Sequence, residues 1–406
     1  MRKIVLAYLT SWKIHTYALN LISYEGGTSE NEGGEKEGER KKIINNIVTL
    51  LKCVARTAFV ILNNVYCIPT YVVWMMLLFP VKIYQPQVYW RIEGLFFHWL
   101  LAMVSMWTWS AGYDIIEQGD DIQKIISEKT LVIANHQSTG DVPILMTTFN
   151  AKPNVLPNLM WIMDRVFKFT NFGIVSVLHQ DFFISSGRKR REESLKQLQK
   201  HLKDSYIPRD RKWMVLFPEG GFLCKRRETS QKYAKKNNLP ILENVTLPRV
   251  GAMQMIFDTL GPAESRNAEA QHLNSRPSMM VANPEISWIL DITIAYPQGK
   301  PLDLPTIITG SRPPCETVLF YRLFPSSVVP REPEQLSKWL YDRWVEKEAL
   351  LEHFYKHGTF LGTNGSNREN SKLHQDPLRF LVLHLFFITS SYIHYSMLTY
   401  VLSCFW

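Results

Sequence analysis

The chain has 406 residues, of which 46% are hydrophobic and 20% charged, and its formal net charge is +9. The 12 Trp, 17 Tyr and 21 Phe exclude a wholly disordered chain, because disordered sequences lack the aromatic residues that build a core. A mean hydropathy of −0.12 excludes a polytopic transporter. The five cysteines are spaced too irregularly for a disulfide framework or a C-x-x-C metal site. The positive charge suits phosphate, nucleic acid or an anionic membrane surface.

The first 45 residues are predicted to be an N-terminal extension. The stretch from Glu25 to Arg40 is rich in glutamate and glycine and contains no aliphatic or aromatic residue. Such a segment buries too little apolar surface to offset the entropy of ordering its backbone. We therefore predict an acidic disordered linker here.

Three long runs carry no charged residue: Thr57–Val81, Gly94–Tyr113 and Phe380–Trp406. Each is long enough for a membrane-spanning helix, which needs about 20 apolar residues. The first two are predicted to form a membrane helix pair over residues 46–115, either a hairpin within one leaflet or two spans. Residues 378–406 are predicted to form a C-terminal transmembrane helix. Three buried core helices are the alternative.

Residues 116–360, between these membrane segments, alternate short apolar strands with helical stretches. The predicted strands are Thr130–Ala134, Gly173–Leu178, Trp213–Phe217, Asn244–Leu247, Ile286–Tyr296 and Thr317–Phe324. The predicted helices are Arg190–Lys203, Val250–Leu260 and Glu334–Tyr355. This alternation predicts an α/β domain with a central mixed sheet flanked by helices. Two polar segments are predicted as a surface insertion at 261–283 and a linker at 361–377.

A polar segment that includes Asn135, His136, Ser138 and Asp141 follows the first predicted strand. Open α/β sheets bind ligands at the carboxyl ends of their strands. A histidine there can take a proton near neutral pH, and a nearby carboxylate would orient its ring. The alternative is a helix cap with a hydrogen-bonded histidine. The motif alone favours neither.

A second candidate site follows the strand 213–217, where Glu219 precedes Gly220 and Gly221. Paired glycines let a ligand approach the backbone closely, and the carboxylate can hold a hydroxyl or an ammonium group. Basic residues lie on both sides of this turn, among them Arg188, Arg226 and Arg227. Guanidinium groups bind phosphate with two hydrogen bonds. A solvated basic face that meets lipid headgroups is the alternative.

Other catalytic signatures are missing from the sequence, which has no G-x-S-x-G, no H-E-x-x-H and no glycine-rich nucleotide loop after a strand. His353 and His357 have the spacing of two metal ligands on one helix face. No third ligand accompanies them, so no metal site is predicted.

Four segments in order resemble the motifs of the glycerolipid acyltransferases, the family of the lysophosphatidic acid acyltransferases. They are the N-H-x-x-x-x-D pattern at His136 and Asp141, Phe182-Phe183-Ile184, Phe217-Pro218-Glu219-Gly220 and Leu247-Pro248. Within this family the chain is most similar to the lysophosphatidylglycerol acyltransferase branch. The resemblance extends from about residue 50 to the C-terminus.

The resemblance implies that His136 is a general base, positioned by Asp141, that activates an acceptor hydroxyl for direct attack on acyl-CoA. It implies no metal and no cofactor besides the acyl-CoA co-substrate. The residues implied for the acceptor and its phosphate are Phe183, Arg188, Glu219, Gly220, Gly221, Arg226 and Arg227. Those implied for the acyl chain or CoA are Asn135, Ser138, Pro248 and Arg249.

The sequence departs from the family pattern at the third motif, where Gly221 and Phe222 replace a common threonine and arginine. This departure favours a larger acceptor, such as a lysophosphodiester, over a phosphate monoester. The expected partners are acyl-CoA, a lysophospholipid and the endoplasmic reticulum membrane, with the catalytic domain facing the cytosol. No nucleic acid or protein partner is expected. A monoacylglycerol acyltransferase, a CoA-independent transacylase and a basic membrane scaffold are the competing hypotheses.

Overall fold

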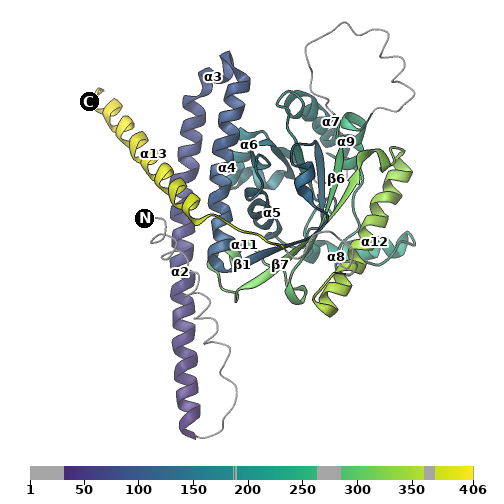
Figure 1. Ribbon diagram of the computed structural model, residues 1–406, viewed down its shortest axis with the longest axis horizontal. Coiled ribbons are helices and arrows are strands. Elements are labelled where there is room, and N and C mark those ends of the chain that lie inside the picture. Colours follow the sequence, from purple (N-terminus) through teal and green to yellow (C-terminus); the bar gives the residue numbers. More distant parts are fainter. Residues whose placement is uncertain (1–31, 186, 188–189, 263–284, 361–370, 406) are drawn as a thin grey trace.

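A central β-sheet with helices on both faces forms the body of the molecule (Figure 1). The computed structural model describes residues 32–185, 187, 190–262, 285–360 and 371–405. Its strands are β1 (Tyr113–Gly119), β2 (Thr130–Ala134), β3 (Leu159–Asp164), β4 (Phe182–Ile184), β5 (Trp213–Leu216), β6 (Trp288–Ala295), β7 (Cys315–Pro325) and β8 (Ser371–Lys372). Along the sheet their order is β4-β3-β5-β2-β6-β7-β1-β8. All neighbours are parallel except β6 with β7 and β1 with β8, which confirms the predicted mixed sheet.

The middle of the sheet is buried on both faces. Side chains alternate along β2, so Leu131 and Ile133 join one hydrophobic cluster while Val132 and Ala134 join the other. The cluster of Leu131 and Ile133 contains side chains of α7 (Arg191–His201), α9 (Gly251–Leu260) and α12 (Pro333–His357). The cluster of Val132 and Ala134 contains side chains of α4 (Pro86–Ala111) and α5 (Asp141–Asn150). A continuous apolar run such as that of β2 is typical of a parallel strand covered on both sides.

Most of the predicted elements of this domain are confirmed. The predicted strands at 130–134, 213–217, 286–296 and 317–324 correspond to β2, β5, β6 and β7. The predicted helices at 190–203, 250–260 and 334–355 correspond to α7, α9 and α12.

Two strand predictions are wrong. Residues 173–178 lie in α6 (Asn171–His179), where Val175 and Ser176 are buried while Ile174 and Val177 are exposed. That is the pattern of a helix, which a short apolar run does not distinguish from a buried strand. Residues 244–247 form a loop, because side-chain carboxylates, rather than a neighbouring strand, accept hydrogen bonds from its backbone N–H groups.

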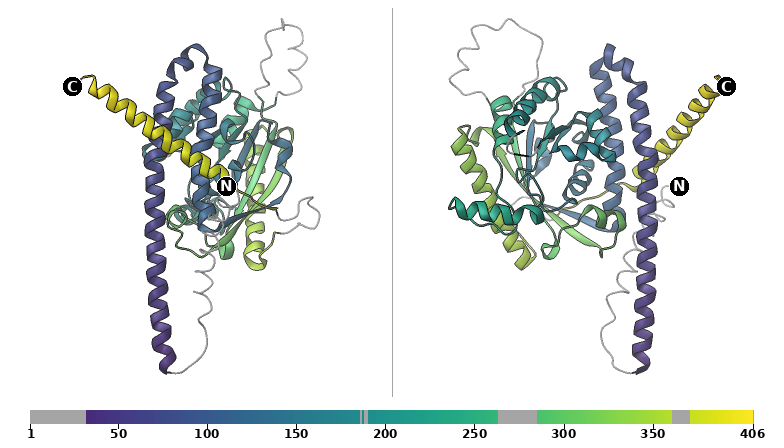
Figure 2. Two further views of the ribbon diagram at one scale, coloured as in Figure 1. Left: turned by 60° about the vertical axis from the view of Figure 1, so that its left-hand side comes forward. Right: turned by 180° about the vertical axis from the view of Figure 1, so that it is seen from behind.

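The long apolar helices lie along one side of the sheet (Figures 1 and 2). Helix α2 (Glu32–Leu77) turns through α3 (Phe79–Tyr84) into α4, and α13 (Pro377–Ser403) crosses α2. In the described parts of the chain, two helices are long and apolar enough to cross a membrane, Gly38–Leu77 and Pro377–Ser403. These helices indicate that the protein associates with a membrane.

The second uncharged run differs from the other two, because α4 buries most of its side chains inside the protein. It packs on α5 and on the short helix η2 (Leu156–Asn158). Burial in the protein therefore accounts for the apolar content of residues 94–111 without a bilayer. Whether α2 and α4 form a hairpin in one leaflet stays a prediction.

The linkers also differ from expectation where the structure describes them. Residues 32–45, expected in part as a disordered linker, are the first turns of α2. Glu, Lys and Arg are good helix formers, and here they extend a helix that the apolar segment stabilises. In the linker expected at 361–377, residues 371–372 form β8, which pairs with β1. Residues 1–31, 361–370 and most of the predicted insertion at 261–283 lie outside the described residues.

Candidate active site

The loop after β2 folds around the carboxylate of Asp141. His136 donates from Nδ1 to Asp141 Oδ2 over 2.8 Å, and the same oxygen accepts from the backbone N–H groups of Gln137 at 2.7 Å and Ser138 at 2.9 Å. These donors belong to the loop and not to helix α5, so Asp141 organises the loop instead of capping the helix. The carboxylate is fully buried.

The His136 ring is held in one orientation, and one of its nitrogens is open. With Nδ1 protonated and held by Asp141, Nε2 carries the lone pair, and it has no hydrogen-bond partner among the described residues. The ring stacks on Phe217, with centroids 4.1 Å apart, and meets the edge of Phe222 at 4.5 Å. About 10% of the His136 side chain stays exposed. The ring is therefore oriented, and one nitrogen remains available to a ligand.

Tyr296 completes the surroundings of Asp141 and was not among the predicted site residues. Its hydroxyl donates to Asp141 Oδ1 over 2.6 Å. Burial raises the pKa of Tyr296 well above its ordinary value, so the hydroxyl remains a donor. Tyr296 follows β6, which lies beside β2 in the sheet. Only knowledge of the strand order would have indicated this contact from the sequence.

Glu219 connects three loops from a buried position. Its Oε1 accepts from the backbone N–H of His136 at 2.9 Å and from Trp344 Nε1 at 3.3 Å. Its Oε2 accepts from the N–H and the hydroxyl of Thr246 at 3.1 and 2.8 Å. Burial raises the pKa of Glu219 to about 7, against the opposing effect of these hydrogen bonds. Since both oxygens are occupied inside the protein, Glu219 holds the His136 loop in place.

Each of the two glycines after Glu219 lies close to an arginine side chain. Gly220 has φ +67°, and a Cβ at this position would lie 3.3 Å from the Arg249 side chain. A Cβ at Gly221 would lie 2.7 Å from Cδ of Arg226, which comes from α8 (Leu223–Lys236). Neither guanidinium forms an ion pair with a carboxylate of the described residues. Two positive charges without an ion pair among the described residues thus lie beside the turn that adjoins His136.

Asn135 and Ser138, two predicted site residues near His136 in the chain, are held by hydrogen bonds within the protein. Asn135 uses its amide nitrogen and oxygen to bind the backbone of Ile294 at 3.0 and 2.7 Å, so it ties β2 to β6. Ser138 donates to the carbonyl of Leu302 and accepts from Gly140 N–H. Both side chains therefore have internal partners.

Four further predicted site residues do not belong to the His136 loop. Phe183 lies in β4, which β3 and β5 separate from β2. Pro248 is buried in the loop before α9, and Arg227 is exposed on α8. Arg188 lies outside the described residues.

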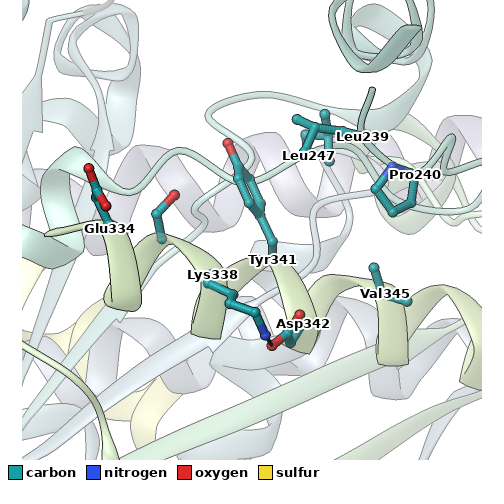
Figure 3. Close-up of a pocket in the computed structure, with 9 residues that line it drawn as sticks. Leu239, Pro240, Leu247, Glu334, Lys338, Tyr341, Asp342 and Val345 are labelled. Atoms are coloured by element: carbon teal, nitrogen blue, oxygen red, sulfur yellow. Dashed lines mark hydrogen bonds and ion pairs between the residues drawn. The ribbon is translucent and has the colours of Figure 1, made fainter. Parts of the chain in front are cut away.

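A pocket of 350 Å³ lies beside the fourth motif (Figure 3). It is lined by Leu239, Pro240, Leu247, Glu334, Ser337, Lys338, Tyr341, Asp342 and Val345. Leu239, Pro240 and Leu247 belong to the loop whose Thr246 binds Glu219, whereas the other lining residues lie in α12. His353 and His357 stack with centroids 4.4 Å apart, and no group of three metal-binding side chains occurs in the parts of the chain that the structure describes.

Comparison with known proteins identifies the family. A family described as Acyltransferase matches residues 115–258, and one described as Acyltransferase C-terminus matches residues 307–388. Acyl-CoA:lysophosphatidylglycerol acyltransferase 1 of Homo sapiens is 44% identical over 361 residues, covering 87% of this chain and 96% of the relative. Lysocardiolipin acyltransferase 1 of Gallus gallus is 24% identical, with 71% and 70% covered.

Among solved structures, the 1-acyl-sn-glycerophosphate acyltransferase PlsC from Thermotoga maritima is 14% identical, covers 72% of this chain and 97% of its own, and has a TM-score of 0.35. The family assignment rests on the sequence matches alone. With 44% identity over nearly the full length of a named acyltransferase, the chain belongs to the glycerolipid acyltransferase family.

Proposed function

We propose that this acyltransferase moves a fatty acyl group from acyl-CoA to the free hydroxyl of lysophosphatidylglycerol or a related lysophosphodiester, in phospholipid remodelling. The observation that carries the proposal is the oriented His136 ring with one open nitrogen. The relative named for lysophosphatidylglycerol, which is 44% identical to this chain, supports the acceptor class.

The reaction needs only one proton-transfer group. His136 Nε2 takes the proton of the acceptor hydroxyl, and the oxygen attacks the carbonyl carbon of the thioester. The new C–O bond forms as the C–S bond breaks, and the leaving CoA thiolate receives the proton from His136. Because the thiolate is a good leaving group, no serine or cysteine nucleophile is required. A positioned base contributes about 10²–10⁴-fold in rate.

In this proposal Arg226 and Arg249 bind the phosphodiester of the acceptor. Their side chains converge on Gly220 and Gly221, next to the His136 loop. Guanidinium groups recognise phosphate oxygens in pairs, and these two replace the arginine that is common in the third motif of the family. A phosphodiester carries one negative charge, which two arginines can bind while the headgroup beyond the phosphate extends away.

An acceptor panel tests this function. The purified protein in detergent is given labelled acyl-CoA with lysophosphatidylglycerol, other lysophospholipids or monoacylglycerol, and acyl transfer between phospholipids is followed without CoA. We expect CoA-dependent acylation of a lysophosphodiester, and His136→Ala should lower it by about 10²–10⁴-fold. A preference for monoacylglycerol or transfer without CoA would favour the competing activities. Full activity of the variant would contradict the mechanism.

We also propose that the catalytic domain faces the cytosol from the endoplasmic reticulum membrane, where acyl-CoA is available. Asn244 and Asn364 stand in N-x-S/T patterns that are glycosylated only in the lumen. The Asn244 amide nitrogen donates to Glu348 over 2.8 Å, so the folded domain already uses it. Neither site should carry glycan in cells. A mobility shift on endoglycosidase treatment would contradict the proposed orientation.

A further inference from the structure

An exposed apolar surface with two basic residues lies at the edge of the sheet that carries His136. The short helix η3 (Arg165–Phe169) exposes 71% of Val166 and 81% of Phe169. The following helix α6 adds Ile174 and Val177, both more than two-fifths exposed. We refer to Val166, Phe167, Phe169, Ile174 and Val177 as the η3–α6 surface. Contiguous exposed apolar side chains of this kind mark an interaction site.

The structure holds this surface in a fixed shape. Asp164 accepts a hydrogen bond from the Val166 N–H at 3.0 Å and so begins η3. Gly173 lies so close to the backbone of η3 that a Cβ there would be 2.2 Å from the Lys168 carbonyl oxygen. On the inner side of α6, Phe172 packs against Trp107 of α4 with ring centroids 6.1 Å apart. The apolar side chains are therefore presented outward by a packed unit.

The η3–α6 surface connects the membrane helices with the reaction site. Helix α6 contacts both α2 and α4, beside which Figure 1 shows it. Helix η3 directly follows β3, and β3 is parallel to β5, which is parallel to β2. The carboxyl ends of β3 and β2 thus share one edge of the sheet, two strand spacings or about 10 Å apart.

The charge on this surface identifies its partner. Arg165 and Lys168 are exposed beside the apolar side chains, and within the described part of the chain neither forms an ion pair. Apolar and aromatic residues combined with Lys and Arg are typical of helices that lie in the headgroup region of a bilayer. Helix α2, which α6 contacts, also exposes apolar side chains, among them Leu62, Val65 and Met76. These side chains are suited to contact with lipid as well.

We propose that the η3–α6 surface inserts into the lipid monolayer and that the lysolipid acceptor leaves the membrane at this point to reach His136. Val166 and Phe169 enter the acyl-chain boundary, while Arg165 and Lys168 contact lipid phosphates. The insertion is independent of the reaction. The delivery of the acceptor rests on the proposed function.

A photocrosslinking experiment tests the insertion without reference to activity. Benzoylphenylalanine is placed at Phe169 in the full chain, reconstituted in vesicles that contain an anionic phospholipid. Tyr233 is the matched control position, because it is 54% exposed and belongs to α8. Figure 1 shows α8 on the other side of the sheet from α2. We expect lipid adducts at position 169 several times more abundant than at 233. Equal yields, or adducts to a second copy of the protein in place of lipid, would overturn the proposal.

Activity measurements test the delivery of the acceptor. The double variant Val166→Glu and Phe169→Glu changes only exposed side chains, and Tyr233→Glu serves as its control. With an acceptor embedded in vesicles, the double variant should lose about tenfold in rate, because two apolar side chains no longer enter the bilayer. With a short-chain acceptor dissolved as monomers its rate should equal that of the wild type.

An equal loss on both acceptors would overturn the delivery role. A wild type inactive on every acceptor would instead overturn the proposed function, and the crosslinking result would stand.

Discussion

Two buried histidine–carboxylate pairs, His136–Asp141 and His179–Glu93, differ in whether the second nitrogen of the ring is bound. In the pair His136–Asp141, Nδ1 is bound and Nε2 is open. In the pair His179–Glu93, Nδ1 donates to Glu93 Oε1 at 2.7 Å and Nε2 donates to the carbonyl of Leu159 at 2.9 Å. A ring whose two nitrogens both contact buried protein acceptors has no nitrogen open to a ligand, so it cannot act as a base. The second nitrogen, and not the pair itself, distinguishes the proposed base from a structural histidine.

The surroundings of the two pairs agree with this distinction. Glu93 also accepts from the Tyr71 hydroxyl at 2.6 Å and from Arg209 at 2.8 Å, and the His179 ring stacks on Phe97 with centroids 3.5 Å apart. These residues come from α2, α4, α6 and the segment before β5. The Glu93 cluster therefore joins the long apolar helices to the catalytic domain.

The largest expected effect is that of Asp141→Asn on the rate. An amide at this position places an N–H group opposite at least one donor of the loop, so the His136 ring loses its fixed tautomer and orientation. Amide replacement in a comparable histidine–carboxylate pair lowers kcat by about 10⁴. We expect a loss of about 10²–10⁴ in kcat with a small change in KM, measured by initial rates on vesicle-embedded acceptor. A variant with unchanged kcat would show that Asp141 has no part in orienting the base.

A smaller effect, on stability and not on chemistry, is expected for His179→Ala. Removing the ring takes a buried hydrogen-bond partner from Glu93 and another from the Leu159 carbonyl, and each loss costs about 1–3 kcal/mol. We expect Tm in detergent to fall by several degrees for His179→Ala and by less for His136→Ala, because Asp141 keeps its three other hydrogen-bond donors and the His136 ring is partly exposed. His357→Ala, at an exposed position, is the control. If His136→Ala destabilised the protein as much as His179→Ala, the two pairs would not differ as described.

The sequence predicts the residues of the His136 site that follow the strands directly. His136, Asp141 and Glu219 follow apolar strands whose composition is recognisable, so their place at one sheet edge could be inferred before the structure. Tyr296 and Trp344 could not, because their contacts depend on which strands are neighbours and on how α12 packs. The Glu93 cluster could not be predicted either, because it depends on how α2 and α4 pack against the domain. In addition, His179 follows an apolar run that is predicted as a strand and is a helix in the structure.

The smallest expected effect is the pH dependence of stability that Glu219 introduces. Burial raises the pKa of this carboxyl from 4.5 to about 7, so the folded state binds its proton more tightly than the unfolded state. The stabilisation is complete below pH 4.5 and is lost as the pH rises through about 7. Between these values Tm of the wild type should fall relative to that of Glu219→Gln, which does not titrate. Parallel Tm curves for the two proteins from pH 5 to 8 would show that Glu219 does not titrate in this range.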